Sequence, residues 1–162
     1  MTLEMNRPKC CCFTGHRENK LKRSEKEILE DLKQAINQAI DDGYTTFITG
    51  MAYGVDIWAG ELVLKKRFWN RNIKLIAAIP FAGFESRWKD RWKDRYHKLL
   101  NKAGEVHYIC DSYSKYAYQK RNEWMVDRYA RVIAVYNGEP SGTGNTINYA
   151  KKVGVPAVYI QA

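Results

Sequence analysis

The chain has 162 residues, a formal net charge of +9 and a hydrophobic fraction of 45%. This length suits one domain with a full-sized core, and the apolar content excludes an intrinsically disordered chain. No apolar run approaches the ~20 residues that span a bilayer, and the polar stretch Met1–Lys9 lacks the apolar segment of a signal peptide. We therefore expect a single domain over residues 1–162, located in the cytoplasm and without a membrane partner. The positive charge favours anionic partners, although an ordinary solvated basic surface would carry it equally well.

Apolar runs typical of strands alternate with helical patterns from the start of the chain. The first run, Cys10–Thr14, holds three consecutive cysteines, and neighbours on a strand point to opposite faces. These cysteines therefore predict small buried side chains rather than a metal site. Ser24 then begins a helix with a capping box to Glu27, and Gly43 ends that helix.

The alternation continues to the end of the chain. Further strands are predicted over 45–49, 73–79, 106–110, 131–136 and 156–160, and further helices over 55–69, 84–103, 116–130 and 143–152. Mostly apolar strands separated by helices indicate a parallel sheet covered on both faces. The predicted fold is α/β: a Rossmann-like, doubly wound, mainly parallel sheet of about six strands. Cys110 ends one of these strands, and the sequence leaves open a redox pair with Cys12.

A local repeat stands in the predicted helix 84–103, where Arg-Trp-Lys-Asp occurs twice in succession. The four-residue spacing places four rings on one helical face: Phe84, Trp88, Trp92 and Tyr96. A stripe of this kind usually packs on a sheet while its charged neighbours face solvent. The alternative is a basic, aromatic surface that stacks the bases of single-stranded nucleic acid.

Three strand-end loops are suited to close approach of an anionic ligand. In a doubly wound sheet, ligands bind beyond the carboxyl ends of the strands, where helix N-termini favour anions. The first loop is Thr14, Gly15, His16 and Arg17. Glycine permits a tight turn against a ligand, and the Arg17 guanidinium matches a phosphate. His16 either fixes this loop by a hydrogen bond or acts as an acid or base, and we assign it no proton-transfer role.

The second loop follows the second predicted strand and leads into a helix. Its candidate ligand-binding residues are Thr49, Gly50, Met51, Ala52, Gly54 and Asp56. Asp56 lies in the first turn of the helix, so it either caps the helix or accepts hydrogen bonds from ribose hydroxyls.

The third loop precedes the last predicted helix and is rich in small and hydroxyl-bearing residues, as an anion-binding site requires. Its candidate residues are Asn137, Gly138, Ser141, Gly142, Thr143, Gly144, Asn145 and Thr146. The lysine of a Walker A loop is absent, and the first loop lacks the G-x-G-x-x-G of a dinucleotide dehydrogenase. Both of those nucleotide-binding classes are excluded.

Together the three loops resemble the SLOG superfamily, which groups DprA/Smf-like DNA-processing proteins with LOG-type nucleotide enzymes. Residues 50–56 match the G-[LM]-A-x-G-[IV]-D motif of the DprA branch, and residues 141–146 match its S-G-[ST]-x-x-T. The small YpsA-type branch is similar over nearly the whole chain, through residues 14–17, the pair Pro80-Phe81, Trp88 and residues 121–127. This resemblance implies a Rossmann-like fold that binds a nucleotide derivative, and it adds Pro80, Phe81, Glu85, Arg121 and Asn122 to the candidate site.

Two positions depart from the patterns of these relatives. Glu85 stands where the YpsA-type branch often has a glutamine. Thr146 stands where LOG-type phosphoribohydrolases carry a catalytic glutamate, so the resemblance argues against their reaction. For Arg121 and Asn122 a solvated surface pair at a helix start is the plain alternative.

The leading hypothesis is a binding or sensor domain for a nucleotide or an ADP-ribose-like derivative. We assign no catalytic residue, no metal site and no cofactor beyond this nucleotide-type ligand. The alternatives are a phosphoribohydrolase-like enzyme and a DprA-like module that binds single-stranded DNA through the basic surface. The sequence also leaves open a homo-oligomer.

Overall fold

The computed structural model describes residues 9–162. The polar stretch Met1–Lys9, from which we expected no signal peptide, therefore lies outside the described residues except for Lys9. The strands are β1 (Cys10–Gly15), β2 (Thr46–Thr49), β3 (Lys74–Ile79), β4 (Glu105–Tyr108), β5 (Arg131–Tyr136) and β6 (Ala157–Gln161). The helices are the 3-10 turn η2 (Glu18–Lys20) and α2 (Glu25–Asp41), α3 (Val55–Trp69), α4 (Asp90–Lys102), α5 (Ala117–Asp127) and α6 (Gly142–Val153). Within residues 9–162, no helix is long and apolar enough to cross a bilayer.

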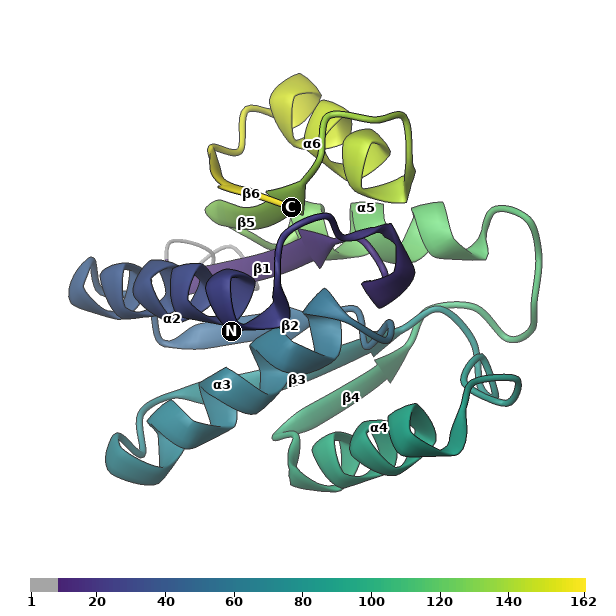
Figure 1. The fold of residues 1–162 in the computed structure, drawn as a ribbon, viewed down its shortest axis with the longest axis horizontal. Coiled ribbons are helices and arrows are strands. Elements are labelled where there is room, and N and C mark those ends of the chain that lie inside the picture. Colours follow the sequence, from purple (N-terminus) through teal and green to yellow (C-terminus); the bar gives the residue numbers. More distant parts are fainter. Residues whose placement is uncertain (1–8) are drawn as a thin grey trace.

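The strands form one parallel sheet in the order β4-β3-β2-β1-β5-β6 (Figure 1). From β1 the chain winds outward to β4, and it then returns across the sheet through α5 to place β5 on the other side of β1. Because crossovers between parallel strands are right-handed, reversing the direction of winding moves the helices to the opposite face. The predicted doubly wound, Rossmann-like α/β fold is confirmed.

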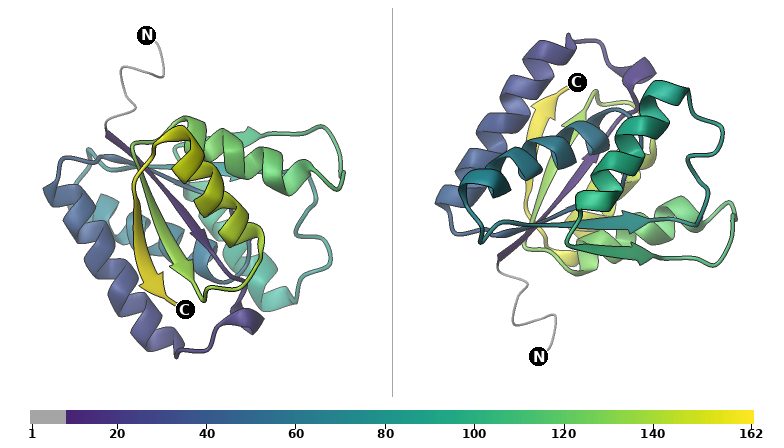
Figure 2. Two further views of the ribbon diagram at one scale, coloured as in Figure 1. Left: turned by 90° about the horizontal axis from the view of Figure 1, so that it is seen from above. Right: turned by 90° about the horizontal axis from the view of Figure 1, so that it is seen from below.

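The two faces of the sheet are covered by different helices (Figure 2). The larger core cluster joins α2, α3 and α4 to one face, and the smaller cluster joins α5 and α6 to the other. The cysteine run follows this division, because Cys11 belongs to the larger cluster while Cys10 and Cys12 belong to the smaller one. All three are buried, as the sequence predicts.

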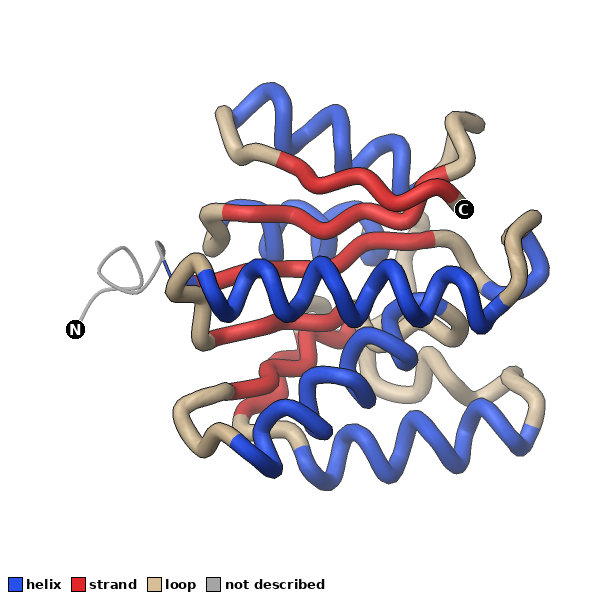
Figure 3. The backbone as a smooth tube through the Cα atoms, turned by 60° about the vertical axis from the view of Figure 1, so that its left-hand side comes forward, coloured by secondary structure: helices blue, strands red, loops and turns tan. Residues whose placement is uncertain are grey.

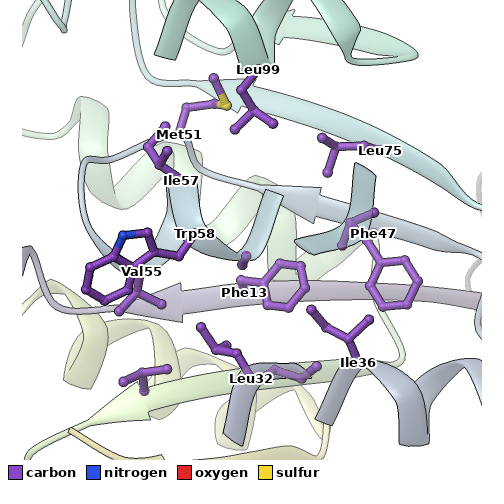
Figure 4. Close-up of a cluster of buried hydrophobic side chains, with 14 of the residues drawn as sticks. Phe13, Leu32, Ile36, Phe47, Met51, Val55, Ile57, Trp58, Leu75 and Leu99 are labelled. Atoms are coloured by element: carbon purple, nitrogen blue, oxygen red, sulfur yellow. The ribbon is translucent and has the colours of Figure 1, made fainter. Parts of the chain in front are cut away.

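The larger cluster anchors the strand ends that build the candidate site. Phe13 of β1 and Phe47 of β2 stack with ring centroids 6.0 Å apart, and Leu32 and Ile36 of α2 lie next to them in the same cluster (Figure 4). At the start of α2, the Ser24 hydroxyl accepts the amide of Glu27 at 3.2 Å, which confirms the predicted cap. The strands run in one direction, so the loops after their carboxyl ends gather at one edge of the molecule (Figure 3).

One prediction from the sequence is wrong, and one possibility that the sequence left open is not realised. The helix predicted from Phe84 begins only at Asp90, because Lys89 has an extended backbone and residues 81–87 form turns. The redox pair of Cys12 with Cys110 does not form, and both are free cysteines. Two strands, β2 and β3, separate β1 from β4, and neighbouring strands lie about 4.8 Å apart, too far for a disulfide to bridge.

Candidate functional site

A cavity of about 380 Å³ opens where the winding reverses, between the carboxyl ends of β1 and β5. Four separate segments of the chain line it. We call this cavity the switch-point crevice, and its lining residues are Phe13, Thr14, Gly15, His16, Arg17, Asn19, Lys20, Ala52, Tyr53, Asp56, Tyr118, Arg121, Asn122, Met125, Ser141, Gly142 and Thr143. The structure thus brings the first loop, parts of the second and third loops and the Arg121-Asn122 pair to one place.

Arg121 is the most constrained cation of the crevice. It is 5% exposed, its Nε donates to the Asn122 side-chain oxygen at 2.8 Å, and its Nη1 donates to the carbonyl of Gly50. A Cβ atom at Gly50 would lie 2.8 Å from that Nη1, so a side chain at this position would displace the guanidinium. Burial lowers the pKa of Arg121, an effect that Asp56 opposes. Arg121 and Asn122 are therefore built into the crevice and do not form a solvated surface pair.

Asp56 is the acidic residue of the crevice lining, and it is 6% exposed. Its Oδ2 accepts the amide of Ala52 at 3.2 Å, while its Oδ1 is buried without a hydrogen-bond partner. Burial raises the pKa of Asp56 to about 6, although Arg121 and the Ala52 amide act in the opposite direction. The N-cap position of α3 is Gly54, which has no side chain that could form a capping hydrogen bond. Asp56 thus bonds back to its loop and does not cap the helix.

His16 fixes the relation between the first and third loops. Its Nε2 accepts the amide of Asn137 at 3.1 Å, and its ring stacks on Tyr136 with centroids 5.7 Å apart. Burial lowers the pKa of His16, which favours the neutral imidazole that this accepted hydrogen bond requires. Of the two roles considered for His16, the geometry matches loop fixation.

The third loop ends in a capped helix start. The Ser141 hydroxyl accepts the amide of Gly144 at 3.1 Å, and the Thr146 hydroxyl donates to the carbonyl of Gly142 at 2.9 Å. The amides of the first two residues of α6 have no partner within the helix. A Cβ atom at Gly142 would meet no neighbour within 4 Å, so this turn of backbone borders open crevice space.

Several residues predicted for the site lie outside the crevice lining. Met51 is wholly buried in the larger core cluster and adopts a φ of 65°, a strained backbone for a residue with a side chain (Figure 4). Thr49 donates to the carbonyl of Asp56 at 2.7 Å, and Gly54, with a φ of 96°, allows the second loop to approach the backbone of Glu18. The remaining predicted residues that do not line the crevice are Gly50, Pro80, Phe81, Glu85, Asn137, Gly138, Gly144, Asn145 and Thr146.

Sequence reasoning missed other members of the lining. Tyr53 lies beneath the Arg17 guanidinium, whose Cζ is 4.9 Å from the ring centroid, and Tyr118 approaches from α5. Asn19 and Lys20 come from η2. Tyr53 stands inside the G-[LM]-A-x-G-[IV]-D motif at its variable position, so the motif itself gives no signal for it.

Fold and crevice together define a doubly wound α/β protein with a polar, partly cationic cavity at the switch point of its sheet. The family model of YpsA, described as the YspA SLOG family, matches residues 11–154. The chain therefore belongs to this SLOG family, and the resemblance seen in its loops is confirmed.

One curated relative and two solved structures are similar to this chain. An uncharacterised SPbeta prophage-derived protein, YoqJ of Bacillus subtilis, is 37% identical over 121 residues, which are 65% of this chain and 69% of YoqJ. DNA processing protein A (DprA) of Streptococcus pneumoniae superposes with a TM-score of 0.68 at 20% identity over 99% of this chain. DprA of Helicobacter pylori superposes with a TM-score of 0.69 at 18% identity over the full chain. The superposed region is 52% of the first DprA chain and 69% of the second, and at these identities the likeness shows the fold alone.

Proposed function

We propose that the switch-point crevice binds a nucleotide or a nucleotide derivative such as ADP-ribose, with its ribose at Asp56 and its phosphate at the start of α6. The observation that carries this proposal is the buried, unpartnered Oδ1 of Asp56 in the crevice. Buried polar atoms are almost always hydrogen-bonded, so an unpartnered acceptor on a residue that lines a cavity suits a donor from a ligand. Ribose hydroxyls are such donors, and an acidic residue binds them in many Rossmann-like proteins.

Positive charge and free backbone amides form the part of the crevice that would bind the phosphate. Arg17 and Lys20 line the same crevice as the first turn of α6, whose unpartnered amides and helix dipole favour an anion. Arg121 adds a buried positive charge to the same lining and interacts electrostatically with Asp56. A ligand that carries both ribose hydroxyls and phosphate would use all of these groups, whereas a neutral ligand would leave the cations uncompensated.

The relatives support a nucleotide-related ligand without naming one. The Helicobacter pylori DprA structure is described as showing a single-stranded DNA binding mode, and that description applies to DprA. The LOG-type glutamate is replaced by Thr146, whose hydroxyl is bonded to the carbonyl of Gly142. The proposal is therefore binding without turnover, and chromatography of nucleoside monophosphates after incubation with the protein tests the hydrolase alternative.

A blocking substitution at Gly142 tests the site. Gly142→Val places a branched side chain in open crevice space, so the fold should be kept while ligand binding is lost. The measurement is a thermal-shift screen with inorganic phosphate, pyrophosphate, nucleoside mono- and diphosphates and ADP-ribose. A compound at ~100 times its dissociation constant should stabilise the wild type by about 2.7 kcal/mol. The matched control is Asn148→Val, which adds the same side chain at an exposed position of α6. Equal ligand shifts in both variants would remove the third loop from the site.

Replacing Asp56 tests binding of the ribose separately from binding of the phosphate. Asp56→Asn should weaken binding of nucleoside diphosphates at least tenfold while changing pyrophosphate binding little, because only the former carries ribose. Isothermal titration calorimetry measures both affinities. Equal losses for the two ligands would contradict the ribose assignment.

A further inference from the structure

A second, larger cavity of about 910 Å³ adjoins the crevice. We call it the aromatic groove, and its lining residues are Arg17, Glu18, Asn19, Tyr53, Phe81, Gly83, Phe84, Ser86, Arg87, Trp88, Lys89, Arg91, Trp92, Tyr113 and Tyr118. Arg17, Asn19, Tyr53 and Tyr118 line both cavities. The groove and the crevice are therefore neighbouring parts of one depression, with Arg17 and Tyr53 at their junction.

Aromatic rings from separate segments form the walls of the groove. Tyr53 packs edge-on against Trp88 with centroids 5.3 Å apart, and Phe81 packs edge-on against Tyr113 at 5.6 Å. Phe84 and Trp92 are buried beneath the groove, but Tyr113 is 65% exposed. In edge-on packing the edge of one ring meets the face of the other. The ring that contributes its edge therefore keeps both of its faces free of that neighbour, and such faces are the surfaces on which nucleobases stack.

The charge of the groove is largely positive. Arg91 is paired with Glu18 at 2.5 Å, whereas Arg87 and Lys89, both exposed, make no ion pair within residues 9–162. Arg17 lies at the junction, with its guanidinium over the Tyr53 ring. Of these cations, Arg17 lines both cavities, so it stands where a phosphate link between two rings would pass.

We propose that the aromatic groove is a second ring-binding subsite, and that the ligand has two nucleoside halves joined through phosphate. One half occupies the crevice, the phosphate link lies at Arg17, and the second base stacks against the groove rings. This inference rests on the proposed function, because the crevice must first hold a nucleotide. Each cavity falls in the range of about 300–1,000 Å³ typical of ligand pockets, so a single nucleotide would leave the larger one empty.

Two sources share this ligand chemistry: a soluble dinucleotide with a 5′–5′ diphosphate link, and consecutive nucleotides of a single strand with a 3′–5′ link. Calorimetry should compare adenosine monophosphate, adenosine diphosphate, a 5′–5′ diphosphate-linked diadenosine and 3′–5′ oligoadenylates of two, four and eight units. At least one of the linked ligands should bind about tenfold or more tightly than the single nucleotides. If the 5′–5′ linked ligand binds more tightly, the source is a soluble dinucleotide. If the 3′–5′ oligoadenylates bind more tightly, the source is a single strand.

The variant Tyr113→Ala tests the groove itself, since this side chain is exposed there and its loss spares the core. Tyr113→Ala should weaken the tight linked ligand by about fivefold or more, the usual effect of losing one base-stacking ring, and leave adenosine monophosphate unchanged. The matched control is Tyr159→Ala on β6, whose side chain is exposed and does not line the groove.

The outcomes separate the two proposals. If adenosine monophosphate binds, but linked ligands bind no tighter and Tyr113→Ala has no effect, the second subsite is overturned and the crevice assignment stands. If neither single nor linked nucleotides bind the wild type, both proposals are overturned. An equal loss of all ligands in Tyr113→Ala would also overturn the subsite, because that ring would then belong to the crevice.

Discussion

The switch-point crevice and the aromatic groove meet at Arg17 and Tyr53, but they are held in different ways. In the crevice, buried polar groups are fixed by hydrogen bonds, such as those from Arg121 to Asn122 and to the carbonyl of Gly50. In the groove, the walls are rings packed edge-on, and the charged groups lie at the rim. Neighbouring parts of one depression therefore depend on different interactions: the crevice on backbone hydrogen bonds and buried charge, and the groove on aromatic packing.

The largest expected effect concerns the ring that supports the groove from below. Trp92 is 2% exposed and packs against both Tyr53 and Trp58, at 5.9 and 6.2 Å between centroids. Trp92→Ala should therefore destabilise the fold by about 3–5 kcal/mol, the usual cost of emptying a buried aromatic site. Urea unfolding measures this loss of stability.

An exposed tryptophan of the same chain provides the matched control. Trp69 is 85% exposed, so Trp69→Ala should change the free energy of unfolding by no more than about 0.5 kcal/mol. A Trp92→Ala variant as stable as Trp69→Ala would show that the groove does not depend on aromatic packing.

The next effect concerns the buried carboxyl group of the crevice. Burial raises the pKa of Asp56 to about 6, against about 3.9 in an unfolded chain. Between these values the folded state holds a proton that the unfolded state has lost, so this group lowers the stability of the wild type as the pH rises from about 4 to 6. The free energy of unfolding of Asp56→Asn, relative to the wild type, should therefore increase by up to about 3 kcal/mol from pH 4 to pH 7.

Urea unfolding at four pH values between 4 and 7 tests this expectation. His16 is present in both proteins, so its own titration cancels in the difference. Asp41→Asn, at an exposed position of α2, controls for the exchange of a carboxylate for an amide. A difference between Asp56→Asn and wild type that does not vary with pH would show that Asp56 is not an uncompensated buried acid. A gain in stability together with loss of nucleotide binding would mark it as a residue kept for function.

The difference between the two cavities also explains what the sequence could predict. The sheet, its winding and the loops at residues 14–17 and 141–146 follow from local patterns: apolar strands, a glycine beside a strand end and a serine at a helix start. Topology alone then brings these loops together, because all carboxyl ends of a parallel sheet share one edge. This is why much of the crevice lining could be predicted.

The groove depends on information that a local pattern does not contain. The four-residue spacing of Phe84, Trp88, Trp92 and Tyr96 is that of a helix, but the chain turns before Asp90, and only Trp92 and Tyr96 lie on α4. The rings still cluster, with Phe84 and Trp88 at 4.9 Å, so the predicted burial of Trp92 is right for a reason other than helical alignment. Tyr53, Tyr113 and Tyr118 join them from three other segments, and only tertiary packing brings them there.

The smallest expected effect concerns the ion pair at the rim of the groove. Arg91 and Glu18 are 2.5 Å apart, but their side chains are 57% and 37% exposed. Exposed pairs contribute about 0.2–1 kcal/mol and are screened by salt. A double-mutant cycle of Arg91→Gln and Glu18→Gln, measured by urea unfolding, should therefore give a coupling energy below about 1 kcal/mol that disappears in 1 M salt.

A second pair on the same helix supplies the comparison for this cycle. Arg95 binds both oxygens of Glu61, at 3.0 and 2.5 Å, and both side chains are 34% exposed. Because the bidentate geometry fixes both groups and water screens them less, the coupling of Arg95 with Glu61 should exceed that of Arg91 with Glu18. The reverse order, or a rim coupling above about 2 kcal/mol, would mean that charge rather than ring packing holds the groove wall against η2. In that case salt would loosen the groove while leaving the hydrogen-bonded crevice intact, and linked ligands would lose affinity with ionic strength far faster than single nucleotides.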